Sequence, residues 1–211
     1  MPDSQSEHTG GLSSEIVVGA VILAAGASRR LNRAKQLLEI DGRPLVLHAV
    51  DCALASKCGD VVVVLGANRD EIAKVVAPTG ATVVYNKNWS EGKASSIRCG
   101  LETLIKNNRE MTAAIIMTCD QPYVSAAHLD RLIATHLSHH AAIVASAYAG
   151  TRGIPALFAK ELFPQLLSLT GESGAKEIIL SHEEKAQAVA FPRGEVDIDT
   201  WQDFTRLRPN K

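Results

Sequence analysis

The stretch VILAAGASRRLNRAK, residues 21–35, joins an apolar run to a loop of small residues and then to a basic cluster. The apolar run begins at Val17, is long enough for a buried strand and ends before Gly26. Small residues at a strand end let backbone N–H groups approach a ligand closely, because no bulky side chain intervenes. Four basic side chains follow: Arg29, Arg30, Arg33 and Lys35. The pattern therefore predicts a strand-end loop that binds an anion.

Strand-like runs alternate with helix-like segments along most of the chain. Residues 60–66 and 113–120 are continuous apolar runs, typical of strands covered on both faces. Shorter strands are expected over 81–86, 142–150, 153–159, 186–192 and 195–199, and helices over 44–54, 69–77, 95–105, 125–137 and 175–183. This alternation predicts a single-domain α/β fold, a Rossmann-like three-layer sandwich with a mostly parallel sheet.

Three strand ends carry the features expected of a ligand site. Ligands of such sheets bind beyond the carboxyl ends of the strands, where Gly26, Gly66 and Asp120 are expected. A glycine-containing loop followed by basic residues can hold a triphosphate through its amides and its Arg and Lys side chains. The loop is neither a P-loop nor a dinucleotide fingerprint, since GxxxxGK[ST] and GxGxxG are both absent. The alternative is an ordinary turn with exposed arginines.

Carboxylates stand in two places where they could hold a cation. Asp120 ends a buried strand in TCDQPYV (118–124), and such a carboxylate suits Mg²⁺ on a phosphate chain. In EVDIDT (195–200), Asp197 and Asp199 share one face if the segment is a strand. Two carboxylates at such a short separation need water, a basic side chain or a cation to compensate their charges. The alternatives are a turn cap for Asp120 and a solvent-facing edge strand for the pair.

A further polar segment, SEGKASSIRCGL (90–101), stands at an expected helix start. Its Gly92, Lys93, Ser95 and Ser96 offer backbone N–H groups and hydroxyls to a base, a ribose or a phosphate. Capping of the helix by Ser95 or Ser96 is the alternative, and Ser125 is expected to cap the helix over 125–137. By contrast, the three histidines 136, 139 and 140 have no partners at metal-ligand spacing, and the hydrolase motif GxSxG is absent.

Length, charge and cysteine pattern exclude several classes of protein. A chain of 211 residues suits one domain, and a net charge of −1 disfavours attraction to nucleic acid or an acidic membrane. The four cysteines show neither a CxxC pair nor a metal-ligand spacing, which indicates a reducing compartment. No run approaches the roughly 18 apolar residues of a membrane span. We expect a cytoplasmic protein with a disordered lead-in over 1–15, which lacks the features of a signal peptide, and a domain over 16–211.

Taken together, the motifs resemble a known family. LAAGASRRLNRAK (23–35) is similar to the LAAGxGxRMGxxK signature of nucleotidyltransferases with a glycosyltransferase-A-like fold. EGKASSIRCGL, CDQPYV, GIPALF, LTGESGAKEII and VDIDT resemble, in the same order, the later blocks of the molybdenum cofactor cytidylyltransferases, the MobA/MocA-like branch. The resemblance extends over residues 18–204. It implies a nucleotide-diphospho-sugar transferase type of fold.

The resemblance also implies an activity and a set of site residues. The expected reaction transfers CMP from CTP, with Mg²⁺, to the terminal phosphate of molybdenum-bound molybdopterin and releases pyrophosphate. The resemblance gives catalytic roles to Arg30, Lys35 and Asp120, and metal binding to Asp120 with Asp199 or Asp197. The expected nucleotide-binding residues are Leu23, Ala24, Ala25, Gly26, Ala27, Ser28, Arg30, Lys35, Gly66, Ser96 and Asp120.

Local differences bear on the base and on the acceptor. Guanylyl-transferring relatives carry LAGG, and the methyl of Ala25 reduces the space beside the loop, which favours CTP over GTP by about 1–3 kcal/mol. Leu31-Asn32 replaces the family's Met-Gly, and Asn tolerates the left-handed backbone. Two further positions depart from the family pattern and bear on the acceptor. They are Ile154 and the segment Trp201-Gln202-Asp203, where the family has Pro-Glu-Asp.

Other readings of the same motifs remain open. They are nucleotidyl transfer to a sugar or polyol phosphate, guanylyl transfer to molybdopterin, and a non-catalytic cofactor carrier that serves a molybdenum hydroxylase apoenzyme. The carrier is disfavoured by the presence of Arg30, Lys35, Asp120 and the second acidic pair. A protein that only binds the cofactor would not need both basic residues for a triphosphate and carboxylates for its metal ion.

Overall fold

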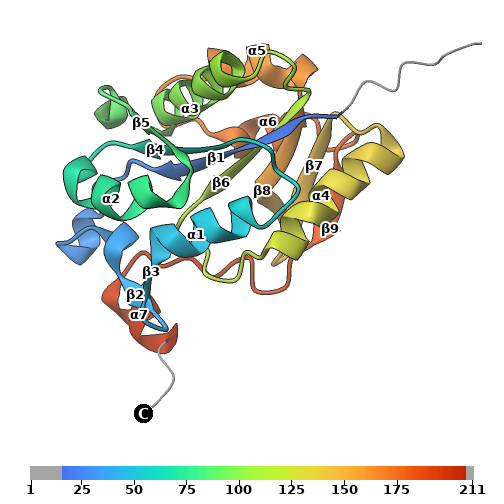
Figure 1. Ribbon diagram of the computed structural model, residues 1–211. Helices are drawn as coiled ribbons and strands as arrows, with labels where there is room; N and C mark the ends of the chain where they lie inside the picture. The colour runs from blue at the N-terminus through green and yellow to red at the C-terminus, as the bar shows by residue number, and fades with distance from the viewer. Residues whose placement is uncertain (1–15, 208–211) are drawn as a thin grey trace, which may run out of the picture.

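A seven-stranded, mostly parallel sheet forms the centre of the molecule (Figure 1). The computed structural model describes residues 16–207, so the lead-in expected over 1–15 lies outside the described residues. The strand order is β5-β4-β1-β6-β8-β7-β9. The α/β fold class expected from the sequence is confirmed.

The parallel half of the sheet is built by the first strands of the chain. β1 (Val18–Ala24) lies between β4 (Val61–Leu65) and β6 (Ala113–Thr118), and β5 (Thr82–Tyr85) pairs with β4, all in parallel. Because these strands run the same way, their carboxyl ends lie along one edge of the sheet. Gly26, Gly66 and Asp120 all follow such ends.

The other half of the sheet mixes strand directions. β8 (Thr151–Ala159) runs antiparallel to both β6 and β7 (Ile143–Tyr148), and β9 (Gln187–Ala190) pairs with β7 in parallel. A two-stranded ribbon of β2 (Glu39–Ile40) and β3 (Arg43–Pro44) stands apart from the sheet.

Helices cover both faces of the sheet (Figure 1). α1 (Leu45–Leu54), α2 (Arg69–Val76) and α4 (Ala126–His139) pack on one face, and α3 (Lys93–Asn107), α5 (Phe163–Ser168) and α6 (Ala175–Ser181) on the other. The alternation along β1 produces the two cores: Ala20 and Ile22 face the first helix layer, whereas Val21 faces the second. In the described part of the chain, no helix is long and apolar enough to cross a membrane.

A third, smaller cluster fastens the end of the chain to the basic segment. Ile198 and Phe204, the latter on α7 (Trp201–Leu207), pack with Leu31, Leu38 and Leu45. This contact brings the segment around Asp199 next to the segment around Arg30. The two are far apart in sequence and depend on tertiary packing to meet.

Two local expectations are wrong. Residues 195–199 form no strand: Ile198 donates one backbone hydrogen bond, to Asp120 O (3.1 Å), and its buried side chain packs with Leu31 and Phe204 instead of within the sheet. Neither Ser95 nor Ser96 caps α3, since the helix begins at Lys93 after Gly92. Ser125 does cap α4, as expected, by accepting a bond from His128 N.

Candidate active site

The loop that follows β1 is held by its carbonyl groups. Gln36 Nε2 donates to the carbonyls of Ala24 and Gly26, both at 2.9 Å, and Ala67 N donates to that of Ala25 at 3.0 Å. Within residues 16–207, the amides of Gly26 and Ala27 donate to no protein acceptor. A Cβ on Gly26 would meet no atom within 4 Å, so the space beside the loop is open. Free amides beside open space can bind an anion.

The basic segment folds into two short 3-10 helices, η1 (Arg29–Leu31) and η2 (Lys35–Leu37). Ser28 and Asn32 flank η1 in left-handed conformations, with φ of 52° and 55°. The Asn at this position therefore supports the turn that the family builds with glycine, as expected from the sequence. Lys35 N then donates to Ser28 Oγ at 3.0 Å, which ties η2 back to the loop.

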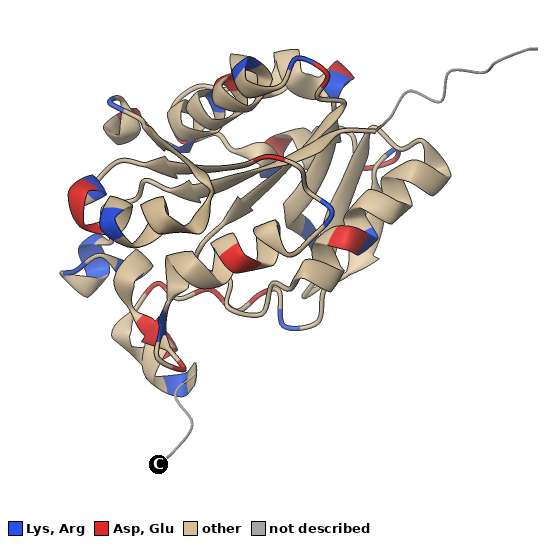
Figure 2. Ribbon diagram, in the orientation of Figure 1, with Lys and Arg blue, Asp and Glu red and all other residues tan. Residues whose placement is uncertain are grey.

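Two of the predicted cations meet two of the predicted carboxylates beyond the end of β6. Lys35 Nζ contacts the carboxylate of Asp120 and lies 3.1 Å from Asp199 Oδ1, while Arg30 Nη2 lies 2.8 Å from Asp199 Oδ2. Charged segments of both signs gather where η1 and the C-terminal loop meet, at the lower left of Figure 2. We call Arg30, Lys35, Asp120 and Asp199 the charge cluster.

The other basic residues of the segment lie apart from the charge cluster. Arg29 is exposed, and the guanidinium of Arg33 lies 5.8 Å from the centre of the Trp201 ring on α7. Asp197 forms no ion pair among the described residues. The residues singled out in the sequence therefore include all four members of the charge cluster, and also Arg29, Arg33 and Asp197, which lie outside it.

Electrostatics in the cluster favour charged side chains at its centre. Burial opposes the charge of Lys35, but the charge of Asp120 and the hydrogen bonds to Asp120 and Asp199 together raise the pKa of Lys35. Burial opposes the charge of Asp199 too, yet hydrogen bonds from Lys35 and Arg30 lower its pKa. Burial together with the charges of Asp120 and Asp199 raises the pKa of Asp197 to about 7. Lys35 and Arg30 thus match the charges of Asp120 and Asp199, and Asp197 is a third acidic group beside them.

The charge cluster offers a divalent cation two carboxylate ligands. Asp120 and Asp199 contact the same ammonium group, so their oxygens lie within reach of one ion. Residues 16–207 contain no group of three or more His, Cys, Asp or Glu side chains arranged to hold a metal. Mg²⁺ takes oxygen ligands, often one or two carboxylates, and completes its shell with water and phosphate oxygens. The donor set is therefore suited to a metal carried by a phosphate chain.

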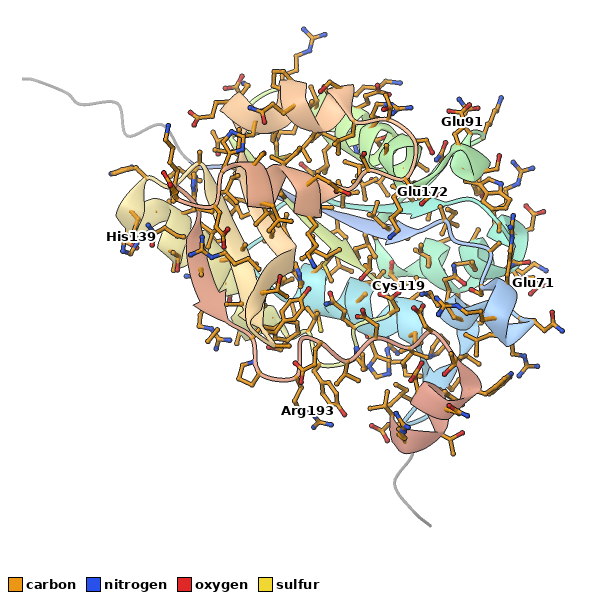
Figure 3. All side chains as sticks on the ribbon, turned by 180° about the vertical axis from the view of Figure 1, so that it is seen from behind. Glu71, Glu91, Cys119, His139, Glu172 and Arg193 are labelled. Atoms are coloured by element: carbon orange, nitrogen blue, oxygen red, sulfur yellow. The ribbon has the colours of Figure 1, made fainter. Side chains whose placement is uncertain are left out.

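A cleft of about 450 Å³ opens at the carboxyl ends of β4 and β5. It is lined by Gly66, Asn68, Arg69, Asp70, Glu71, Asn86, Lys87 and Trp89. A Cβ on Gly66 would lie 2.5 Å from Trp89 Cβ and 2.7 Å from Ala25 O, so only glycine fits between the loop and the cleft. Figure 3 shows Glu71, one of the lining residues, and Glu91 at the same end of the molecule. The cleft therefore continues the surface of the loop.

Ser96 is a buried side chain next to this cleft, not a helix cap. Asn86 Nδ2 donates to Ser95 Oγ at 2.8 Å and to Ser96 Oγ at 3.0 Å. Asn86 N also bonds to Leu65 O at the end of β4. Among the remaining loop residues, Ala24 and Ala25 are buried and Leu23 is half-buried against the α3 face.

Three supporting residues were missed by the sequence predictions. Gln36 and Asn86 are polar residues with 1% and 6% exposure; Gln36 directly follows the basic segment, and Asn86 is the last residue of the strand expected over 81–86. Asp203 Oδ2 accepts from Asp199 N at 3.3 Å, from Thr200 N at 2.9 Å and from Thr200 Oγ1 at 2.7 Å. Gln36 and Asn86 directly follow Lys35 and Tyr85, and Asp203 stands four positions after Asp199. No motif encodes their partners, which are backbone groups together with the hydroxyls of Ser28, Ser95, Ser96 and Thr200.

The sheet, the loop with its free amides and the charge cluster are the features of an α/β protein that handles nucleotides. A model of the family described as the MobA-like NTP transferase domain matches residues 20–186. The chain belongs to this family and is a nucleotidyltransferase.

Two curated relatives cover most of the chain. The nicotine blue oxidoreductase of Paenarthrobacter nicotinovorans is 33% identical over 168 residues, which are 75% of this chain and 79% of the relative. The purine catabolism protein PucB of Bacillus subtilis is 30% identical over 210 residues, 93% of this chain and 98% of PucB. The names of these two relatives describe different roles. The similarity therefore establishes the family of this chain but not its substrate.

Solved structures of related proteins agree with the fold. Rv0371c of Mycobacterium tuberculosis superposes with a TM-score of 0.78 at 28% identity, covering 91% of this chain and 97% of its own. A complex of Rv0371c with manganese gives a TM-score of 0.75 at 26% identity, covering 90% and 97%. A protein from Archaeoglobus fulgidus, titled molybdopterin-guanine dinucleotide biosynthesis protein A, shares the fold at 15% identity, with a TM-score of 0.62 over 90% and 96% of the two chains.

Proposed function

We propose that the protein transfers CMP from CTP to the terminal phosphate of molybdenum-bound molybdopterin, with Mg²⁺, and releases pyrophosphate. The observation that carries the proposal is the charge cluster beside the loop 25–28. It places cations and carboxylates side by side, as a metal-bound triphosphate requires. The product is the cytosine dinucleotide form of the cofactor.

The loop and the basic side chains bind the phosphate chain. The amides of Gly26 and Ala27 donate to phosphate oxygens, and Lys35 and Arg30 exchange their carboxylate partners for oxygens of the triphosphate. A phosphate oxygen of the acceptor forms a bond to the α-phosphorus, and the bond from the α-phosphorus to the bridging oxygen breaks. The fixed cations stabilise the charge that accumulates on the transferring group.

Asp120 and Asp199 are the residues that would hold Mg²⁺, with Asp197 as a neighbouring carboxylate. When bound, the ion neutralises phosphate charge and orients the chain for in-line displacement. The manganese complex of Rv0371c supports a divalent ion for this kind of protein. Asp203 keeps Asp199 in place by accepting bonds from Asp199 N and from Thr200.

The base is proposed to be cytosine and to occupy the cleft at the carboxyl ends of β4 and β5. Ala25 is buried at the inner side of the loop, and its carbonyl is tied to Ala67 N. The Ala25 methyl narrows the space beside the cleft, which favours a pyrimidine over a purine. Gly66 lies against Trp89 in the same region. Ser96 accepts a hydrogen bond from Asn86, a residue of the cleft.

The acceptor rests on the order of the later sequence blocks, which resemble molybdenum cofactor cytidylyltransferases. The proposed partners are CTP, a molybdopterin-type phosphate and a molybdenum hydroxylase apoenzyme that receives the product. The proposed compartment is the cytoplasm, in keeping with the free thiols of the described residues. Neither a nucleic acid nor a membrane is part of the proposal.

The test is a product analysis with the purified full-length chain. Molybdenum-loaded molybdopterin and Mg²⁺ are incubated separately with CTP, GTP, ATP and UTP, and released pyrophosphate and the nucleotide adduct are measured. We expect pyrophosphate and a cytidylylated pterin in equal amounts, with CTP the preferred nucleotide.

Other outcomes would replace the proposal. A guanylylated pterin as the main product would make the enzyme a guanylyltransferase. An adduct on a sugar or polyol phosphate, with none on the pterin, would change the acceptor class. Binding of pterin without pyrophosphate release would indicate a carrier. Redox conversion of nicotine blue, in a separate assay with an added electron donor and no CTP, would favour the activity named for the Paenarthrobacter relative.

A further inference from the structure

Gln36 connects the loop to Lys35 through a closed set of hydrogen bonds. Its side chain is 1% exposed. Nε2 donates to two loop carbonyls, and Oε1 accepts from Ser28 Oγ at 3.3 Å. Ser28 Oγ in turn accepts from Lys35 N at 3.0 Å. One buried amide thus joins the end of β1, the middle of the loop and the start of η2.

These bonds determine which way the loop amides point. The C=O of one residue and the N–H of the next belong to one planar trans peptide and point in opposite directions. Because Gln36 holds the carbonyl of Gly26 inward, the N–H of Ala27 points away from Gln36. Because Ala67 N holds the carbonyl of Ala25, the N–H of Gly26 likewise points away from it. Neither amide therefore points at the group that holds the neighbouring carbonyl, and among the described residues neither donates to a protein acceptor.

We propose that Gln36 is a positioning residue that orients the loop amides toward the phosphate chain of the nucleotide and keeps Lys35 beside them. The proposal rests on the proposed function, because it assumes that the loop binds a phosphate chain. Gln36 itself does not contact the substrate, since its polar atoms are engaged with Ala24, Gly26 and Ser28. Its role lies in the geometry that it imposes before the nucleotide arrives.

Two substitutions separate this role from simple packing. Gln36→Met keeps the length of the side chain but removes the amide donor and the carbonyl acceptor. Gln36→Glu keeps the shape and the bond from Ser28, but places carboxylate oxygens against the carbonyls of Ala24 and Gly26. If Gln36 only filled space, both variants would bind phosphate normally once folded.

A matched control removes a side chain–backbone link far from the site. Thr112 Oγ1 accepts from Val17 N and donates to Val17 O, both at 3.0 Å, at the amino ends of β1 and β6. Thr112→Val is expected to lower the melting temperature without affecting ligand binding. It shows what loss of stability alone does to the binding constants.

The measurement is the Kd of Mg–CTP and of Mg–pyrophosphate by calorimetry on folded protein, with melting temperatures recorded in parallel. We expect both Kd values to rise about 10-fold in Gln36→Met and more in Gln36→Glu, because two hydrogen bonds that fix the loop are lost. The Thr112→Val values should equal those of the wild type.

The outcomes keep the two proposals apart. Wild-type Kd values in both Gln36 variants would overturn the positioning role and leave the proposed function standing. A wild-type protein that binds neither CTP nor pyrophosphate would overturn both. If Gln36→Met does not fold, Gln36→Glu decides, because it preserves the packing volume. A rise in Kd that appears equally in Thr112→Val would assign the effect to stability and refute the role.

Discussion

The ammonium of Lys35 contacts the carboxylate of Asp120, although 85 positions separate the two residues in the chain. Both side chains are 16% exposed, so each charge depends on the other for compensation. Lys35 follows the loop after β1, and Asp120 follows β6, the neighbouring parallel strand. The pairing of two strands thus places a cation suited to phosphate beside a carboxylate suited to a metal ion.

Replacing Lys35 with Ala is expected to lower kcat/KM for CTP at least about 10-fold. The physical reason is the loss of a charge-assisted contact to the phosphate chain, worth about 1.5–3 kcal/mol. Steady-state kinetics with saturating pterin provide the measurement. Lys106→Ala, an exposed lysine at the far end of α3, serves as the control. Unchanged kinetics in Lys35→Ala would remove the basic segment from the site.

Removing the carboxylate of Asp120 is expected to lower kcat by orders of magnitude in Asp120→Ala. Asp120→Asn keeps an oxygen but loses the charge, so it should also be severely impaired, with partial rescue by added Mg²⁺. The measurement is kcat as a function of Mg²⁺ concentration, with circular dichroism to verify folding. Asp130→Ala, a surface carboxylate that accepts from Lys57 N, is the control. Normal turnover in Asp120→Ala would identify Asp120 as a turn cap.

Asp199 is expected to matter more than Asp197. Asp199 contacts both Lys35 and Arg30, whereas Asp197 pairs with neither in the described residues. Asp199→Ala should therefore reduce kcat and weaken the apparent affinity for Mg²⁺ more strongly than Asp197→Ala. Parallel Mg²⁺ titrations of the two variants test the order. The reverse order would assign the metal to Asp197.

Widening the loop is expected to change the choice of base. Ala25→Gly removes the methyl that is proposed to limit the space for the base, so the ratio of kcat/KM for GTP to that for CTP should rise about 10-fold, the effect of roughly one methyl group. Competition between the two nucleotides measures the ratio directly. Ala67→Gly, whose backbone still holds the Ala25 carbonyl, is the control. An unchanged ratio would show that the methyl does not select the base.

The sequence predicts what repeats along the chain and misses what depends on contact between distant segments. The alternation of apolar runs with helix-like segments is enough to predict the sheet and the strand ends that carry Gly26, Gly66 and Asp120. The arrangement around Asp199 was mispredicted as a strand, because burial of Ile198 among Leu31 and Phe204 fixes it instead. The role of Gln36 could not be predicted either, since its partners are carbonyl groups whose directions exist only in the folded loop.

A buried histidine outside the site predicts how stability depends on pH. His128 is 1% exposed; its Nε2 lies 2.7 Å from Ser146 Oγ, and its Nδ1 lies 3.1 Å from Arg131 Nη2. The ring also stacks on Phe191 at 4.4 Å between centroids. Burial and the nearby Arg131 charge lower the pKa of His128 to about 4.

Because the pKa of His128 is lower in the folded state than its ordinary value of 6.5, acid favours unfolding. The unfolded chain takes up a proton below pH 6.5 that the folded chain accepts only near pH 4, so stability falls across this interval by up to about 3 kcal/mol. Urea denaturation at stepped pH measures the slope. His128→Gln should be less stable at neutral pH, yet lose this part of the slope, whereas His139→Gln, which removes an exposed histidine, should keep it. Equal slopes in wild type and His128→Gln would show that His128 titrates alike in the folded and unfolded states and would refute the lowered pKa.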